Sequence, residues 1–458
     1  MKSFFNRTKI ICTIGPSSFQ ENILRKMVLE GMDIARFNLS HSSPSQHLRI
    51  IRKIRRISKK LDIPIGIMVD LPGAKLRLGF LKRSVYIKEN QRIILKLSKY
   101  SEGSDYLPVP YKIFFATVQI RDTVLLDDGK IELKVVDKKS KYLICRAKNE
   151  GEITSHKSLH IKGKSFNFRI PTSQDLHLIK IFASHVDFIS LSYIKNAQEL
   201  KKAKKIIKAI NPHCFVVSKI ETPQGLRNLR FIIPESDVVM VARGDLGLEV
   251  DLVKLAFIQK KIIKECKMNL IPVIVATQIL ESMVNNPLPH RSEVTDIYNA
   301  VLDGVDALLL SGETSVGRYP IRAVRFLRKI CLNAERSKYQ LEGVFKPLFL
   351  QEQALAEGIL NMSRVLKADK IVVYTDDISI VKIISLISRH QDTIVVVSKK
   401  KLLPLFNIFF GCQAFAVKGK NISIQKIKKY LENIKMVSDH KKYPFLIFKK
   451  SCKLITVI

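Results

Sequence analysis

The sequence predicts an α/β protein: a closed (β/α)8 barrel with an inserted all-β lid domain and a C-terminal α/β domain. Three observations carry this prediction. Short apolar runs alternate with segments of helical pattern, as in parallel β/α folds. Before residue 345 there are eight such units, and eight β/α units are the number that closes a TIM-type barrel. One gap of more than a hundred residues breaks the alternation and has strand-like patterns of its own.

Eight apolar runs are expected to form the barrel strands. They span residues 9–14, 33–39, 65–70, 186–192, 215–220, 237–243, 272–278 and 305–311. Most are separated by 10 to 25 residues of helical pattern. In a barrel of this kind the reactive groups lie at the C-terminal ends of the strands, so functional side chains are expected at those positions.

The long gap follows the third run and contains "VYIKENQRIILKL", "DTVLLDDGKIELKVV" and "KYLICRAKNEG". These read as antiparallel strands, with Asp128-Gly129 marking a hairpin turn. We therefore expect an inserted lid at residues 80–163, and a barrel formed by residues 1–79 and 164–345.

The α/β pattern starts again in residues 346–458. Strands are expected at 370–375, 393–398, 444–448 and 454–458, with helices from about 379 and near 421–434. These elements describe a separate C-terminal domain.

The chain is strongly basic, with 78 Lys and Arg against 41 Asp and Glu and a net charge of +37. In "IIRKIRRISKK" (50–60), isoleucines recur at spacing three, so the basic residues form the wet face of an amphipathic helix. Attraction to anionic metabolites and specific nucleic-acid binding are the alternatives. Because no basic stretch is rich in aromatic residues, we expect no nucleic-acid partner.

Other global features favour a cytoplasmic protein. No apolar run approaches the roughly 20 residues of a membrane span, so no membrane partner is expected. Arg7 and Lys9 interrupt the N-terminal apolar stretch, which excludes a signal peptide. Seven scattered cysteines without a C-x-x-C pair indicate reduced thiols.

Charged residues end the fifth strand, where Lys219 and Glu221 lie two apart and therefore share one face. An internal ion pair is the simplest interpretation of this pair taken alone. Polar residues lie at the ends of other strands as well: Arg36, Asn38, Ser40 and His41 at the second, Asp70, Lys75 and Arg77 at the third, Asp245 at the sixth and Thr277 at the seventh. Each has a structural alternative, such as a helix cap, a turn or an ordinary strand residue. Their convergence on one rim of the barrel favours a functional site.

The residue types indicate phosphoryl transfer. Glu221 and Asp245 supply two hard oxygen ligands, which suit a Mg²⁺ ion completed by substrate and water. The cations around them suit phosphate; they are Arg36, Lys75, Arg77 and Lys219. Phosphoryl transfer needs chiefly positioning and charge stabilisation, and no Ser-His-Asp set is evident.

Several motifs resemble those of the pyruvate kinase family, in its order and spacing. They are "RTKIICTIGPSS", "ARFNLSHSS", "VVSKIETPQG", "VMVARGDLGLEV" and "ATQILESM" followed by "RSEVTDIYNAVLDGVDALLLSGET". The resemblance covers residues 7 to about 335. It implies a TIM barrel with a lid inserted after the third strand, and an enzyme that makes pyruvate and ATP from phosphoenolpyruvate and ADP.

The resemblance also implies roles for the rim residues. Glu221 and Asp245 would bind the divalent metal, Mg²⁺ or Mn²⁺. Lys219 and Arg36 would hold the phosphoryl group in transit, and backbone N–H groups around Gly244 and Asp245 would receive the substrate carboxylate. Thr277 would stand where the enolate of pyruvate is protonated.

Two further sites follow from the same resemblance. Arg77 and Lys157 would hold nucleotide phosphates, with Pro16, Asn38 and His41 beside the nucleotide. Asn38, Ser40, Asp70 and the carbonyl of Leu71 correspond to the family's potassium site.

The chain departs from the family pattern at the potassium site. Lys75 stands where potassium-requiring members carry glutamate and potassium-independent members lysine, so we expect that K⁺ is not required. The alternative is that Lys75 has no functional role and points into solvent. The segment "LPGAKLR" also differs from the family's usual sequence at this turn, because it contains Pro72 and Ala74.

Two other departures concern the lid and the C-terminal domain. The lid exit "HIKGKSFNFRIPTSQD" is unusual, as is Ser158 just before it, which bears on Lys157. The stretch "TDDIS" (375–379) replaces the phosphate-binding turn of members that bind sugar phosphates. Its aspartates would repel phosphate, so we expect no activation by fructose 1,6-bisphosphate.

Two rivals to this function are a related phosphoenolpyruvate-using barrel with another acceptor, and a non-catalytic basic binding protein on the same scaffold. The family is usually homotetrameric, which predicts a homotetramer here. His290, Ser292 and Tyr298 differ from the residues that are most common at the family's subunit interface.

Overall fold

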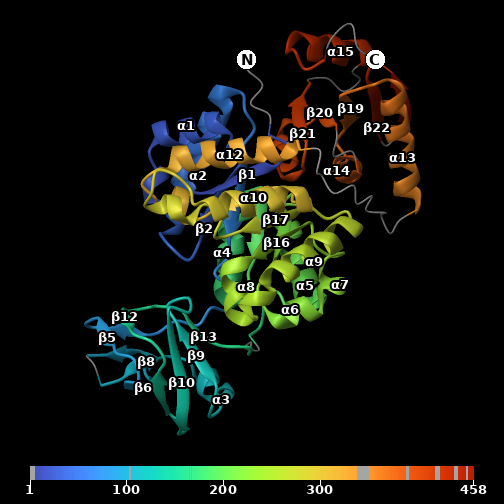
Figure 1. Ribbon diagram of the computed structural model, residues 1–458. Helices are drawn as coiled ribbons and strands as arrows, with labels where there is room; N and C mark the ends of the chain where they lie inside the picture. The colour runs from blue at the N-terminus through green and yellow to red at the C-terminus, as the bar shows by residue number, and fades with distance from the viewer. Residues whose placement is uncertain are drawn as a thin grey trace.

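The computed structural model describes residues 6–102, 105–164, 166, 168–337, 350–387, 391–417, 423–437, 442–449 and 452–457. The predicted boundary at 345/346, the first two residues of the predicted helix 421–434 and the last residue of the predicted strand 454–458 lie outside this part. Figure 1 shows a central barrel, an inserted β region below it and a C-terminal region above it.

Eight parallel strands close into a barrel, in the order β1-β18-β17-β16-β15-β14-β3-β2. The predicted barrel is thereby confirmed. Its strands are β1 Lys9–Thr13, β2 Ile34–Asn38, β3 Gly66–Asp70, β14 Phe188–Leu191, β15 Phe215–Ile220, β16 Val238–Ala242, β17 Val273–Ala276 and β18 Ala307–Leu310. Nearly all strand residues are buried, since helices cover the outside and side chains fill the interior.

The seventh predicted strand, 272–278, is wrong at its C-terminal end. β17 stops at Ala276, because Thr277 and Gln278 have φ values of 69° and 53°. Both residues therefore occupy the left-handed region, which cannot continue a strand.

Helices cover the outside of the barrel (Figure 1). They are α1 Glu21–Glu30, α2 Pro44–Leu61, α4 Ser173–Phe182, α5 Ala197–Ile210, α6 Pro223–Arg227, α7 Leu229–Ile232, α8 Arg243–Glu249, α9 Leu255–Met268, α10 Arg291–Asp303, α11 Gly312–Ser315 and α12 Pro320–Glu335, with the 3-10 turns η1 Pro16–Ser18, η2 Leu252–Lys254 and η3 Glu281–Val284. The predicted amphipathic helix is α2, in which Ile51, Ile54 and Ile57 are buried and Ser43 caps the N-terminus.

The inserted β region contains a six-stranded sheet of order β13-β9-β10-β11-β6-β8. Two-stranded sheets β12-β5 and β4-β7 accompany it. The strands of the whole region are β4 Phe80–Leu81, β5 Val85–Ile87, β6 Arg92–Leu97, β7 Tyr100–Ser101, β8 Leu107–Val109, β9 Thr123–Leu126, β10 Ile131–Lys138, β11 Tyr142–Ala147, β12 Gly151–Ile153 and β13 Leu159–Ile161. The predicted turn joins β9 to β10, with Gly129 at φ 85°. One short helix, α3 Lys112–Thr117, corrects the expectation that this region is purely β.

The C-terminal region holds a five-stranded sheet of order β21-β20-β19-β22-β23. Its elements are α13 Leu350–Val365, β19 Lys370–Thr375, α14 Ile378–Ile387, β20 Asp392–Val397, η4 Lys400–Ile408, β21 Cys412–Ala416, α15 Ile424–Asn433, β22 Pro444–Lys449 and β23 Cys452–Val457. α13, η4 and β21 were not predicted from the sequence.

The 3-10 helix η4 closes the end of the barrel at which the strands begin. Phe406 and Phe409 share one apolar cluster with Phe215 and other residues of the barrel interior. The ring centroids of Phe215 and Phe409 lie 6.3 Å apart. This packing joins the C-terminal region to the barrel and leaves the opposite rim for the polar residues.

Two general expectations can be compared with the described residues. Cys12, Cys145, Cys214, Cys266, Cys331 and Cys412 are buried and free. Among the described helices, none has the length and apolar character required to cross a bilayer.

Candidate active site

The centre of the site is a chain of alternating charges on neighbouring strands. Arg36 in the middle of β2 donates from Nε to Asp70 Oδ2 at 3.1 Å, and from Nη1 to Thr13 Oγ1 at 2.8 Å. Lys219 Nζ lies 3.2 Å from Asp70 Oδ1 and 2.8 Å from Glu221 Oε1. The prediction that Lys219 and Glu221 emerge on one face therefore describes their observed geometry.

These groups are almost removed from water, with exposed fractions of 8% for Lys219, 2% for Asp70 and 0% for Glu221. Burial opposes the charge of Lys219, but Asp70 and Glu221 outweigh it and raise the pKa of this ammonium. Burial likewise disfavours ionised Asp70, yet Lys219 and Arg36 lower its pKa. Lys219 and Asp70 thus hold each other charged in a dry setting.

Asp245 lies at the start of α8 and joins this group through Tyr193. The backbone N–H of Tyr193 donates to Glu221 Oε2 at 2.8 Å, and its hydroxyl donates to Asp245 Oδ1 at 3.3 Å. Burial opposes ionisation of Asp245, but Lys75 and Lys219 lower its pKa to about 2. Burial raises the pKa of Glu221, Lys219 opposes that shift and Asp245 adds to it.

The two carboxylates fit a divalent cation that binds hard oxygen. Buried Glu221 Oε1 accepts no hydrogen bond, and Lys219 is the cation beside it. Within the described residues, no group of three or more His, Cys, Asp or Glu side chains is placed to hold a metal. Two carboxylates are the number that a Mg²⁺ ion completed by substrate and water takes from protein, so Glu221 and Asp245 fit such an ion.

Lys75 does not point into solvent. Its ammonium lies 2.8 Å from Asp245 Oδ1 and 3.2 Å from Asp128 Oδ1, in the hairpin of the inserted β region. Burial lowers the pKa of Lys75, but both aspartates raise it further than burial lowers it. The structure therefore brings Lys75 to a predicted ligand of the divalent metal.

The other residues predicted at the potassium site gather at the ends of β2 and β3, where Asn38 pairs in register with Asp70. Asn38 Oδ1 accepts from the Ser40 N–H at 3.1 Å. The carbonyl of Leu71 accepts from Ser192 Oγ at 2.9 Å. Lys75 makes its ion pairs elsewhere, so the five predicted residues are not one contact group.

Two of the predicted nucleotide-binding residues, Arg77 and Lys157, lie at the junction with the inserted β region. Arg77 Nη1 donates to the carbonyl of His156 at 2.9 Å, and Lys157 Nζ lies 2.9 Å from Asp127 Oδ1. Pro16 begins η1. His41 is exposed; partial burial and then Arg77 and Arg36 lower its pKa.

Thr277 lies opposite the start of α8. Its hydroxyl accepts from the Gly244 N–H at 2.8 Å, which ties two of the predicted substrate-binding residues together. Its left-handed conformation is uncommon for a β-branched residue and marks a site held by its surroundings. The interpretation of Thr277 as an ordinary strand residue is wrong.

Sequence reasoning missed the residue that holds this turn. Buried Arg243 donates to the carbonyls of Thr277 at 2.7 Å and Gln278 at 2.8 Å, and it also pairs with Asp296. The available signal was a charged residue directly after the buried run "VVMVA". Tyr193 was missed too, because its role depends on its backbone N–H.

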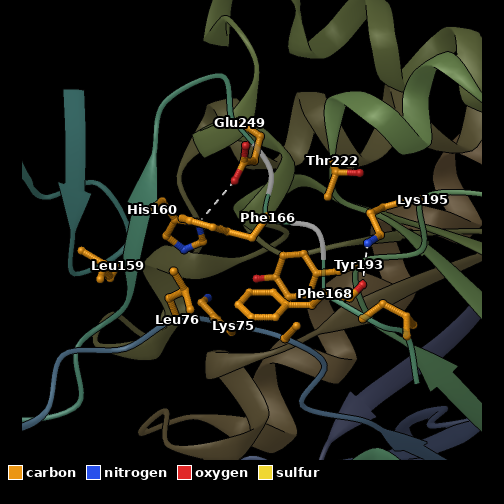
Figure 2. A pocket seen from close by; sticks show the side chains of 12 residues that line it. Lys75, Leu76, Leu159, His160, Phe166, Phe168, Tyr193, Lys195, Thr222 and Glu249 are labelled. Atoms are coloured by element: carbon orange, nitrogen blue, oxygen red, sulfur yellow. Dashed lines mark hydrogen bonds and ion pairs between the residues drawn. The ribbon is translucent and has the colours of Figure 1, made fainter. Parts of the chain in front are cut away.

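A small pocket adjoins the site between the barrel and β13 (Figure 2). Figure 2 shows Tyr193 beside Phe168, with Lys75 close to both. His160 Nδ1 on β13 lies 3.5 Å from Glu249 Oε1 at the end of α8. Polar contacts therefore connect the inserted β region to the barrel at two points, Lys75 with Asp128 and His160 with Glu249.

A barrel whose rim combines two Mg²⁺-suited carboxylates with cations that suit phosphate fits the class of metal-dependent phosphotransferases. The family model described as "Pyruvate kinase, barrel domain" matches residues 5–324. The chain is 37% identical over 338 residues to pyruvate kinase of Thermococcus litoralis, covering 73% of this chain and 71% of that protein. It is 34% identical over 412 residues to that of Dictyostelium discoideum, covering 86% and 81%.

Solved structures agree with the sequence comparisons. A pyruvate kinase from Cryptosporidium parvum superposes with a TM-score of 0.91 at 29% identity, covering 99% of this chain and 96% of that one. The enzyme from Pyrobaculum aerophilum gives 0.87 at 28% identity, covering 99% of each. The chain belongs to the pyruvate kinase family, whose members generally use Mg²⁺.

Proposed function

We propose that this enzyme transfers the phosphoryl group of phosphoenolpyruvate to ADP, giving pyruvate and ATP in the cytoplasm. One observation carries the proposal: Lys219 is held as a buried cation between Asp70 and Glu221, beside Asp245. A cation fixed in a dry pocket stabilises a migrating phosphoryl group without reorganising at the moment of reaction.

The reaction assigns a task to each residue. The bond between phosphorus and the enol oxygen breaks while a terminal oxygen of ADP forms the new bond to phosphorus. Lys219 and Arg36 neutralise the charge on the phosphoryl oxygens during this transfer. Glu221 and Asp245 would hold Mg²⁺, which supplies charge neutralisation for the phosphoryl group when it is bound.

The enolate that leaves takes up a proton at its methylene carbon to become pyruvate. Thr277 is proposed to direct that proton, because its hydroxyl is fixed by the Gly244 N–H next to Asp245. The substrate carboxylate would lie against the backbone N–H groups of Gly244 and Asp245. Arg77 and Lys157 would hold the phosphates of ADP, beside Pro16, Asn38 and His41.

We further propose that K⁺ is not required. The ammonium of Lys75 provides a fixed monovalent charge near Asp245, where it is partly shielded from water. The test measures pyruvate formation with Mg²⁺ in potassium-free buffer, before and after addition of KCl. Full activity without KCl is expected for the wild type, and K75E should depend on KCl.

A matched control keeps this test specific. Lys130 also contacts the hairpin of the inserted β region, at Asp127, but its side chain is 73% exposed. K130E makes the same charge change and should stay independent of KCl. A wild type that is active only with KCl would refute the role of Lys75 and leave the enzyme assignment intact.

Activation by fructose 1,6-bisphosphate is not expected. The carboxylate of Asp376 accepts from the Ser398 N–H at 2.8 Å, and that of Asp377 accepts from the Ser379 N–H at 3.0 Å. The turn after β19 thus presents two acids where a phosphate would need donors. Adding this sugar phosphate should leave the half-saturating phosphoenolpyruvate concentration unchanged.

The remaining proposals concern organisation. The resemblance supports a homotetramer and the boundaries 1–79 with 164–345, 80–163 and 346–458. Light scattering after size-exclusion chromatography should give four times the chain mass. The inserted β region is proposed to act as the lid of the active site.

A further inference from the structure

A second cleft, with a volume of about 1030 Å³, lies at the other end of the barrel. One wall is α2, and the other is η4 with Lys401, Pro404 and Leu405. Its floor is formed by the residues just before β14 and β15, where those strands begin. The cleft therefore lies between the barrel and the C-terminal region, far from the polar rim.

The lining is strongly cationic. Arg49, Arg52, Arg56 and Lys401 line the cleft, and in the described part of the chain no carboxylate forms an ion pair with any of them. Asp187 is the acidic residue of the lining, and Arg55 neutralises it at 2.7 Å. Four positive charges therefore line the cleft in addition to the Arg55–Asp187 ion pair.

The solvated face predicted for α2 explains only part of this arrangement. Buried isoleucines do occupy the opposite face, but η4 places a second wall across from the arginines. Composition does not account for the cluster either. The chain has only 24 arginines among its 78 basic residues, yet four of them fall within residues 49–56. Arginine offers a planar fork that binds phosphate through two hydrogen bonds, which lysine cannot do.

We propose that this cleft binds a small phosphorylated metabolite that carries at least two anionic groups. Arg52 and Arg56 on α2 hold one anionic group, and Lys401 on η4 holds another. Ile210, which is 40% exposed, and Pro404 provide apolar surface for the rest of the molecule. The volume is at the upper end of that of small-molecule sites, so a nucleotide or a sugar phosphate fits.

The cleft is distinct from the catalytic site. β15 runs from Phe215, next to the cleft, to Ile220, next to Glu221 at the rim. Six strand residues at roughly 3.3 Å each place the two sites about 15 to 20 Å apart. The proposal concerns binding, and it stands whether or not the proposed reaction is observed.

The test is calorimetric titration of the full-length protein with inorganic pyrophosphate and with AMP, without Mg²⁺. Each is titrated into the wild type, the cleft variants R52Q/R56Q and K401Q, and the active-site variant K219M. Matched controls remove equal charge nearby: K59Q/K60Q on α2 and K400Q on η4, none of which lines the cleft. Circular dichroism confirms that each variant is folded.

We expect both cleft variants to weaken binding of pyrophosphate, the probe with two phosphate groups, about tenfold or more, and AMP, with one, to bind more weakly than pyrophosphate. The matched controls should stay within about twofold, and K219M should retain the cleft-dependent binding. Equal weakening in K59Q/K60Q would overturn the proposal in favour of general surface charge. Binding abolished by K219M but not by R52Q/R56Q would assign the ligand to the catalytic site. The absence of binding at millimolar probe would also refute it.

An oligonucleotide provides the last comparison. If a 20-nucleotide RNA binds the cleft more tightly than either probe, with steep salt dependence, the small-metabolite identity is wrong. If RNA binds weakly and does not displace pyrophosphate, the proposal is supported.

Discussion

The guanidinium of Arg243 donates a hydrogen bond of 2.7 Å to the carbonyl oxygen of Thr277. Thr277 has a left-handed backbone conformation that a β-branched residue rarely adopts, and the bond to Arg243 helps to hold it there. The hydroxyl of Thr277 in turn accepts from Gly244. The turn that carries the proposed proton-directing group is therefore positioned by a side chain that need not touch substrate.

Replacing this guanidinium should impair catalysis more than binding. R243K keeps a positive charge near Asp296 but loses the fork that reaches two carbonyls. We expect kcat to fall roughly 10- to 100-fold, since misplacement by about 1 Å costs that much, while KM for phosphoenolpyruvate changes little. D296N serves as the control, because it leaves the bonds to Thr277 and Gln278 in place. Wild-type kcat in R243K would contradict the positioning role.

The strand ends were the predictable part of this site. Lys219 and Glu221 follow from the alternation of side chains along a buried strand, and strand ends meet at one rim of a closed barrel. The contact between Lys75 and Asp245 was not predictable, because it joins loops after two different strands, 170 positions apart in the sequence. The turn at Thr277 was missed because β propensity favours a strand for "VIVAT" and long-range bonds from Arg243 override it.

The C-terminal region shows the same limit. Its parallel strands β19 and β20 are continuous apolar runs and were predicted. β21 was missed, since "CQAFA" is short and contains the half-buried Gln413. η4 has Pro404 inside it, which argues against a helix, and it is stabilised by packing into the barrel end.

Replacing Lys219 should distinguish a catalytic role of this residue from a purely structural one. K219M leaves Asp70 and Glu221 facing each other in a buried space, so thermal stability should fall. If Lys219 also stabilises the migrating phosphoryl group, kcat per folded enzyme should drop by roughly 10²- to 10³-fold. Steady-state kinetics and thermal unfolding on the same sample check both effects. A stability loss with unchanged kcat would leave only the internal ion pair.

Lys382 on α14 should make stability depend on alkaline pH. Burial lowers its pKa to about 8 from an ordinary 10.5, although Asp237 opposes the shift. Between pH 8 and 10.5 the unfolded chain therefore binds a proton that the folded chain does not, and stability rises with pH through that window.

K382M should remove this rise and increase the unfolding temperature at pH 7 by a few degrees, on the order of 2–4 °C. Differential scanning calorimetry from pH 7 to 10.5 measures it, and an unchanged pH profile in K382M would show that the rise has another origin.

The contact between His160 and Glu249 should govern how firmly the inserted β region rests on the barrel. Both residues are buried, and the pair joins β13 to the end of α8, one turn after Asp245 (Figure 2). E249Q preserves the size of the side chain but removes its charge, which weakens the attraction to His160. We expect faster amide exchange in β13 and a KM for ADP raised several-fold, with a smaller effect on kcat, because the nucleotide-binding Arg77 and Lys157 lie at the same junction. E152Q on β12 removes an equal charge from the exposed side of the inserted region and should change neither quantity. If E249Q also leaves exchange in β13 and the KM for ADP unchanged, the contact between His160 and Glu249 does not hold the inserted β region on the barrel.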